Sequence, residues 1–181
     1  TVLRGSVVAG GPNSDVIVTA DESILLRGSL TAGRHILISA GTTVKPGTES
    51  IRTFGTSTLK TIHGGEIRIT GVNDVVIDSV VGTGSGDLAL IELASTSGNL
   101  LVAKESGRIE TGTQINFIGH SVEIAGVVTS TRATPDLADY EVSIDIAGTA
   151  SLHGDISLAG SLLVRAADID VYDQSLEVRG V

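Results

Sequence analysis

Glycine recurs along this chain at the head of short segments in which apolar and polar residues alternate. Two stretches of twenty residues, 28–47 and 107–126, align without gaps and share glycine at their first, sixth and last positions. Both carry apolar residues at the third, ninth and eleventh positions. The opening half of the same unit recurs from Gly5, Gly65 and Gly154. Self-similarity of this kind is typical of a repeat architecture, in which each unit packs on its neighbours.

Period-two alternation inside each half of the unit predicts β-strands with one buried face. Ile67 and Ile69 alternate with polar neighbours, and the segment 141–146 shows the same pattern. No window of useful length has the 3.6-residue apolar period of an amphipathic helix. Each glycine inside a helix would also cost about 1 kcal/mol relative to alanine. The sequence therefore predicts an all-β fold.

Composition separates the two architectures that such strands could build. Hydrophobic residues make up 41% of the chain, but aromatic residues only 2%, and Cys, Met and Trp are absent. The strands of a sandwich or an antiparallel barrel enclose a core of mixed side chains that includes aromatic residues. Coils stacked in parallel place like residues above like residues at about 4.8 Å, so uniform aliphatic side chains fill the core. We therefore predict a parallel β-solenoid.

The intervals between the repeat glycines predict coils of about 20 residues. Intervals of 23 and 19 residues correspond to single coils, and intervals of 37 and 42 residues to two coils each. The remaining interval of 28 residues contains the segment 129–140, which includes Pro135. Because proline cannot donate to a strand ladder, we predict a loop insertion there. No linker divides the chain, so residues 1–181 are predicted to form a single solenoid segment.

Charge and composition exclude several classes of partner. The net charge is −9, only three lysines occur, and basic residues form no run, which argues against nucleic acid and anionic membrane surfaces. No apolar stretch approaches the length of a transmembrane helix, so no membrane insertion is expected. The absence of cysteine removes disulfides and zinc–thiolate sites. Because the chain contains no methionine, we expect a segment processed or excised from a longer protein.

The segments 28–41, 107–126 and 154–171 resemble the coils of filamentous-haemagglutinin-type β-helices. The resemblance implies a right-handed β-helix that serves as a fibre, stalk or adhesin in a bacterial two-partner-secreted or giant surface protein. It also implies an extracellular or cell-surface location and a possible cell-surface or matrix ligand. The Asn-Pro-Asn-Gly-Ile element of that family's secretion module has no counterpart here. The resemblance therefore applies to an interior part of such a protein.

A carbohydrate-active β-helix, either a polysaccharide lyase or a glycoside hydrolase, is the alternative function. Glycoside hydrolysis needs two carboxyl groups roughly 5 to 9 Å apart on one face. Asp168 and Asp170 meet this condition on one strand, and Asp136 and Asp139 meet it more loosely. The NTD triad, DD pair and RIK segment of pectin-degrading β-helices are absent, and outward acids are ordinarily solvated. We therefore predict no catalytic residue and no enzyme, and the shortage of aromatic residues argues against a sugar-binding module.

Metal and cofactor sites have little support in the sequence. The four histidines stand apart, at positions 35, 63, 120 and 153, with no HxH or HExxH arrangement. The segment 82–90, which contains Asp87, partly matches the calcium-binding nonapeptide of repeat-in-toxin proteins. It has Thr83 and Ser85 where that motif requires glycine, and it occurs once. We predict no metal and no cofactor.

Neither end of the sequence resembles a cap. Leu176 and Val178 alternate with charged residues as in an interior strand, and residues 1–11 are equally strand-like. An uncapped end coil exposes unpaired backbone groups that pair readily with another strand. The expected partners are therefore further coils of the same parent chain, or identical chains stacked end to end in a filament.

Overall fold

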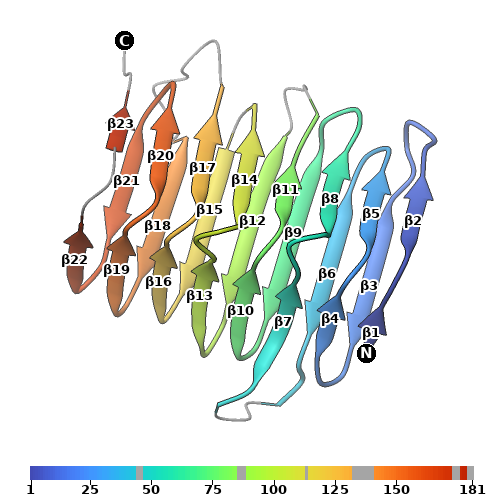
Figure 1. Ribbon diagram of the computed structural model, residues 1–181, viewed down its shortest axis with the longest axis horizontal. Helices are drawn as coiled ribbons and strands as arrows, with labels where there is room; N and C mark the ends of the chain where they lie inside the picture. Colours follow the sequence, from blue (N-terminus) through green and yellow to red (C-terminus); the bar gives the residue numbers. More distant parts are fainter. Residues whose placement is uncertain (44–46, 85–88, 113, 132–140, 173–175, 179–181) are drawn as a thin grey trace.

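A computed structural model describes residues 1–43, 47–84, 89–112, 114–131 and 141–172, and the backbone of residues 176–178. Within these residues every regular element is a β-strand. The strands form three sheets in which all neighbours are parallel, and the chain visits the sheets in turn so that each circuit makes one coil (Figure 1). The predicted parallel β-solenoid is confirmed.

Two sheets contain eight strands each and the third contains seven. Sheet A consists of β1 (Val2–Leu3), β4 (Ile24–Leu26), β7 (Glu49–Thr53), β10 (Asp74–Ile77), β13 (Asn99–Val102), β16 (Ser121–Ile124), β19 (Thr149–Leu152) and β22 (Asp168–Val171). Sheet B consists of β2 (Ser6–Ala9), β5 (Ser29–Ala32), β8 (Thr58–Thr61), β11 (Val80–Gly82), β14 (Arg108–Thr111), β17 (Val127–Ser130), β20 (Asp155–Leu158) and β23 (Leu176–Val178). Sheet C consists of β3 (Val16–Ala20), β6 (Ile36–Ala40), β9 (Glu66–Gly71), β12 (Leu90–Ser95), β15 (Gln114–Gly119), β18 (Val142–Ile146) and β21 (Leu162–Arg165).

The core lies between the three sheets and consists of columns of like side chains. In sheet C the register stacks isoleucines directly on one another, in the order Ile36, Ile67, Ile91 and Ile115. All four are fully buried. The next inward column holds Phe117, which is also fully buried. The aliphatic composition therefore reflects stacking, because each inward side chain packs against side chains of similar shape in the coils above and below.

The coil is longer than predicted, at roughly 24 residues rather than about 20. The position before each of the first seven strands of sheet B forms one column along the stack, occupied by Gly5, Gly28, Ser57, Ser79, Gly107, Gly126 and Gly154. Gly65 precedes β9 of sheet C instead. The interval from Gly28 to Gly107 therefore holds three coils, where the spacing of glycines predicted four.

Serine replaces glycine in two coils of this column because its hydroxyl bonds back to the preceding coil. Ser57 Oγ donates to the carbonyl of Leu26 at 2.9 Å. Ser79 Oγ donates to Thr53 Oγ1 at 2.7 Å. Both serines are buried, so these bonds satisfy hydroxyls that would otherwise be costly to bury.

The predicted insertion at 129–140 begins too early. Thr129 and Ser130 belong to β17 and pair with strands of the coils on both sides. Residues 132–140 lie outside the described residues. The coil that contains this segment is long, since Val122 pairs with Ala150, 28 residues later, whereas Ala150 pairs with Ile169 after 19.

Glycine is required where successive coils approach most closely. A Cβ atom added at Gly154 would lie 1.8 Å from the carbonyl oxygen of Gly126, whereas one added at Gly112 would meet no atom within 4 Å. We expect Gly154→Ala to lower the free energy of unfolding by about 3 kcal/mol or more, because backbone must move to admit the methyl group. Gly112→Ala is the matched control and should change it by less than about 1 kcal/mol. Urea unfolding followed by far-ultraviolet circular dichroism measures both, and equal midpoints would contradict the close approach.

Candidate functional site

The outer face of sheet A presents its side chains in columns, with one residue from each coil. One column runs through Val76, Leu101, Glu123 and Ser151, and its neighbour runs through Asp74, Asn99, Ser121 and Thr149. Strand alternation turns both columns outward, because the residues between them face the core. A hollow of about 470 Å³ follows these columns across five strands, β7, β10, β13, β16 and β19. Its long axis therefore lies along the stack of coils.

A second hollow of about 390 Å³ adjoins the first. Its lining includes Lys104, His153 and Tyr172, and it shares Leu101 and Glu123 with the first hollow. We call the two together the sheet A groove. Ligand sites typically occupy concave surfaces of this size, with an apolar floor and a few polar groups. The groove is therefore the strongest candidate site among the described residues.

Hydrogen bonds and ion pairs hold several of the groove's polar groups in place. Asp74 Oδ1 accepts the backbone N–H of Asn99 at 2.8 Å. At the other end of the groove, His153 Nε2 lies 3.3 Å from Asp170 Oδ2. The His153 ring also meets the Tyr172 ring edge to face, with centroids 6.1 Å apart. Tyr172 is thus oriented by a neighbour while 67% of the residue stays exposed.

The structure places Asp168 and Asp170 on β22, the last strand of sheet A, with both residues exposed. Asp170 continues the column of Glu123 and Ser151, so it stands beside the groove. Within the described part of the chain, the only side-chain hydrogen bond to either carboxylate is the one between Asp170 and His153. Asp136 and Asp139 lie outside the described residues.

The four histidines occupy unrelated environments. His35 Nδ1 accepts the backbone N–H of Glu66 at 2.9 Å, which ties one coil to the next. His63 and His120 are exposed. No group of three or more His, Cys, Asp or Glu residues within the described ranges is arranged to hold a metal ion. Asp87 of the calcium-like segment lies outside those ranges.

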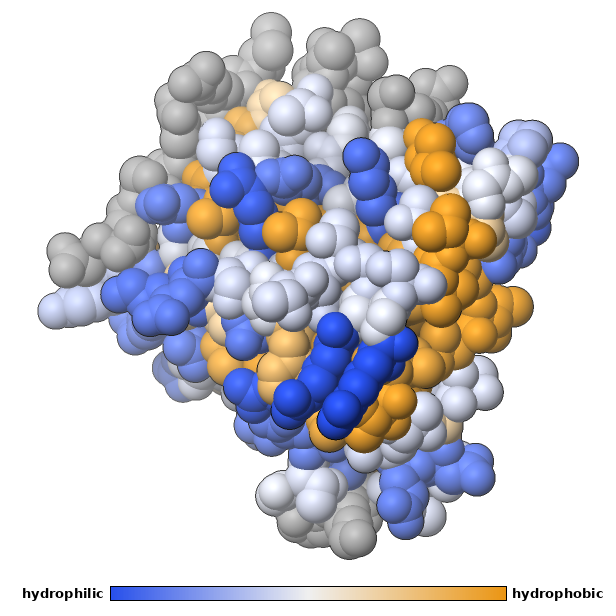
Figure 2. Space-filling view, turned by 45° about the vertical axis from the view of Figure 1, so that its right-hand side comes forward, coloured by the Kyte–Doolittle hydropathy of each residue, from blue (hydrophilic) through white to orange (hydrophobic). Residues whose placement is uncertain are grey.

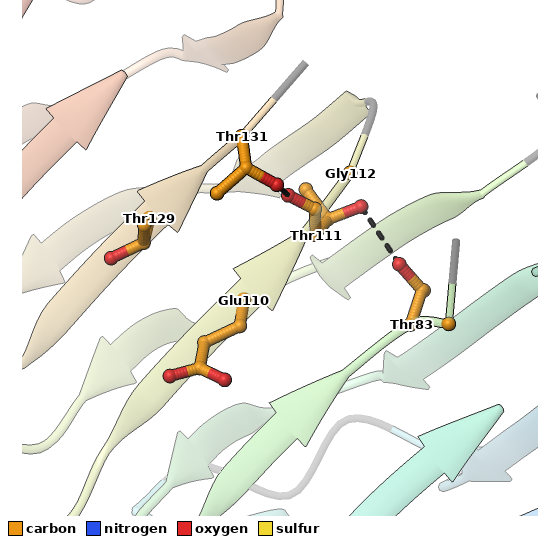
Figure 3. Close-up of a pocket in the computed structure, with 7 residues that line it drawn as sticks. Thr83, Glu110, Thr111, Gly112, Thr129 and Thr131 are labelled. Atoms are coloured by element: carbon orange, nitrogen blue, oxygen red, sulfur yellow. Dashed lines mark hydrogen bonds between the residues drawn. The ribbon is translucent and has the colours of Figure 1, made fainter. Parts of the chain in front are cut away.

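A further hollow of about 390 Å³ opens beside the ends of β14 and β17 (Figure 3). Hydroxyl groups on its wall bond to each other and to backbone: Thr83 Oγ1 and Thr111 Oγ1 are 2.9 Å apart, and Thr131 Oγ1 donates to the Thr111 carbonyl at 3.5 Å. Glu110 is paired with Arg108. These polar groups already have partners within the protein, so this hollow has fewer groups available to bind a ligand than the sheet A groove has.

An ion pair joins two coils near the N-terminal end of the stack. Arg34 donates two hydrogen bonds to Asp15, from Nε at 3.0 Å and from Nη2 at 2.7 Å. These bonds lower the pKa of the Asp15 carboxyl below its usual value and raise the pKa of the Arg34 guanidinium. Asp15 also accepts the backbone N–H of His35 at 3.2 Å. The pair therefore joins neighbouring coils of the stack.

Glu141 is the one carboxyl group buried in the described core, with 2% of the residue exposed. Ser130 Oγ donates to Glu141 Oε1. Glu141 Oε2 is buried and has no hydrogen-bond partner. A buried oxygen without a donor is costly, so the bond from Ser130 is important for tolerating this side chain.

The sequence did not single out Lys104, Glu123 or Tyr172 as site residues. They come from three different coils, and only the register of sheet A brings them to one groove. These residues can be found by aligning the coils, whose lengths vary. Positions that share a column in that alignment lie on the same face of the solenoid. The glycine spacing alone did not give that alignment.

Comparison with known proteins returned no relative. No protein-family model matches the chain, and no curated protein and no solved structure matches it. The described residues include no helix with the length and apolarity that crossing a membrane requires. The structure therefore establishes the fold, a parallel β-solenoid, and the function is inferred from its surfaces.

The Ser130–Glu141 bond gives a direct test of the buried carboxyl. We expect Ser130→Ala to lower the free energy of unfolding by about 1–3 kcal/mol, because Glu141 Oε1 would lose this donor while Oε2 already has none. Ser157→Ala is the matched control, since Ser157 faces outward on the neighbouring strand β20 and is exposed. Its effect should stay within about 0.5 kcal/mol. Equal urea midpoints for the two variants would show that the bond contributes nothing.

Proposed function

We propose that this chain is a structural segment of a bacterial extracellular β-solenoid that serves as a fibre, stalk or adhesin. In this proposal the stack continues at its ends, either into further coils of a parent chain or into identical chains placed end to end. The observation that carries the proposal is the exposure of core-facing residues in both end coils. The resemblance of its coils to filamentous-haemagglutinin-type β-helices supports the bacterial and extracellular part.

The N-terminal coil leaves part of the core uncovered. Val7 lies in the same inward column as Leu30, yet Val7 is 47% exposed and Leu30 is buried. Val2, Val8 and Ile17 add exposed apolar surface at the same end. Figure 2 is turned so that the N-terminal end of the stack comes forward, and it shows apolar surface (orange) gathered on its right-hand side. Such patches usually mark a surface that contacts another protein surface.

The last coil of sheet A is uncovered in the same way. Ile169 and Val171 continue the inward columns of Ala150 and Leu152, which are buried. Ile169 is 54% exposed and Val171 is 53% exposed. Both ends of the stack therefore present the residue types that pack against the next coil in the interior. Parallel stacking at each end would bury them in the manner of every interior layer.

Analytical ultracentrifugation over a concentration series tests stacking between copies. We expect the sedimentation coefficient to rise with concentration, because end coils would pair. Val7→Lys and Val171→Lys should each weaken association by at least about tenfold, since stacking would bury an unpaired ammonium. Ser157→Lys is the control, because it adds the same charge on an exposed outward face and not in an inward column that stacking would bury. Folded wild-type protein that stays monomeric throughout would contradict stacking between copies.

A carbohydrate-active enzyme remains the second candidate, favoured by the position of Asp170 beside the sheet A groove. Activity on a panel of acidic polysaccharides tests it. Cleavage that is lost in Asp168→Asn or Asp170→Asn would support the enzyme and overturn the purely structural function. Cleavage that both variants retain would point to a contaminant.

A further inference from the structure

The sheet A groove has the layout of a binding site on the outward face of the sheet, opposite the inward columns that the end coils leave uncovered. Its floor is apolar, formed by Val76 and Leu101 in the first hollow and by Ala103 and Ala125 in the second. Its rim carries carboxylate, amide, hydroxyl and ammonium groups. A ligand that fits this arrangement must present both apolar patches and many hydrogen-bonding groups along its length.

Backbone geometry argues against a peptide as the ligand. On the face of a sheet, backbone donors and acceptors are already paired within the ladder, and the neighbouring strands of sheet A are hydrogen-bonded on both sides here. An extended peptide gains its affinity mainly by adding to an exposed edge. Only side chains are offered in the groove, and these suit the hydroxyl groups of a sugar.

The shortage of aromatic residues predicted no sugar-binding module, but the groove has one exposed aromatic ring, that of Tyr172, on which a sugar could pack. It lines the second hollow, is 67% exposed and is held edge to face by His153. A pyranose ring has an apolar C–H face that packs on an aromatic ring while its hydroxyls reach neighbouring polar groups. Lys104 can donate to those hydroxyls, and Glu123 can accept from them.

The charge of the groove selects against acidic sugars. Glu49, Asp74 and Glu123 line the first hollow, and Asp170 stands beside the second. Arg52 neutralises Glu49 in an ion pair at 2.6 Å but lines neither hollow. Lys104 is the one lysine or arginine among the lining residues, against the carboxylates of Asp74 and Glu123. A chain of uronic acids would therefore meet net repulsion.

The length of the groove favours an oligosaccharide over a single sugar. The first hollow follows five consecutive strands, and strands in a ladder are spaced about 4.8 Å apart. This spacing is close to the length of one sugar residue in an extended glycan. Successive sugars would therefore meet a side chain from each successive coil.

We propose that the sheet A groove binds a neutral oligosaccharide, lying along the stack with one sugar ring on Tyr172. The proposal concerns recognition without cleavage, and it does not depend on whether the solenoid stacks end to end. It gives a candidate adhesin segment a defined class of ligand.

Isothermal titration calorimetry of the whole chain tests the proposal, with cellohexaose, xylohexaose, maltohexaose and chitohexaose as neutral probes and an oligogalacturonate as the acidic one. We expect at least one neutral probe to bind and the acidic probe to bind more weakly. Tyr172→Ala should weaken binding by about tenfold, as loss of a stacked aromatic ring predicts. Glu123→Gln should weaken it as well.

The controls are Ile118→Ala, an exposed apolar residue of sheet C, and Glu110→Gln, which lines the hollow beside β14. Neither should change the affinity. Circular dichroism of every variant establishes that it is folded, and Leu101→Arg, which blocks the floor without touching the rim, provides a second test. The proposal is overturned if no neutral probe binds at millimolar concentration, if the acidic probe binds best, or if Tyr172→Ala and Leu101→Arg bind like the wild type.

Discussion

Parallel, in-register stacking of one coil on the next is the constraint on which the rest of this structure depends. Each inward side chain packs on the equivalent residues of the coils above and below, about 4.8 Å away. A column such as Ile67, Ile91 and Ile115 is therefore well packed when the same side chain recurs in each coil. Phe117 shows how far a column tolerates variation: its neighbours are Leu93 and Ile144, and all three are buried. The near absence of aromatic residues follows from this packing.

The same stacking restricts the corner that leads into sheet B. At Gly28, Gly126 and Gly154 the preceding coil's carbonyl oxygen occupies the space that a Cβ would need. Ser57 and Ser79 occupy the same column in other coils, and each uses its hydroxyl to bond to the coil before it. The corner thus has two solutions, either no side chain or a short one whose hydroxyl bonds to a buried acceptor on the preceding coil.

These two solutions explain how much of the fold could be predicted from the sequence. Period-two alternation and aliphatic composition were sufficient to predict the parallel solenoid, because both follow directly from the stacking of coils. The predicted coil length was wrong because Gly65 precedes a strand of sheet C, whereas Ser57 and Ser79 precede strands of sheet B. Glycine alone therefore does not mark the coil. The residues of the sheet A groove could not be grouped from the sequence, because grouping them needs the coils to be aligned at their true lengths. Asp170, beside the groove, was considered only because it stands two residues from Asp168 on one strand.

Side chains in the outward columns do not pack in the core, so they need not share one shape. The length of these side chains decides where the surface is hollow. On sheet C, Arg68 reaches across to Glu92 at 3.2 Å and Arg165 reaches Asp145 at 3.7 Å, so long side chains lie over the strands. On sheet A, the equivalent columns contain short residues such as Ser121 and Ser151, and a groove remains above them. Because neither set faces the core, an outward column can change without altering the stack beneath it. A solenoid built this way keeps one scaffold while its faces can acquire separate binding properties, as the proposed stacking at the ends and the proposed ligand binding on sheet A would both require.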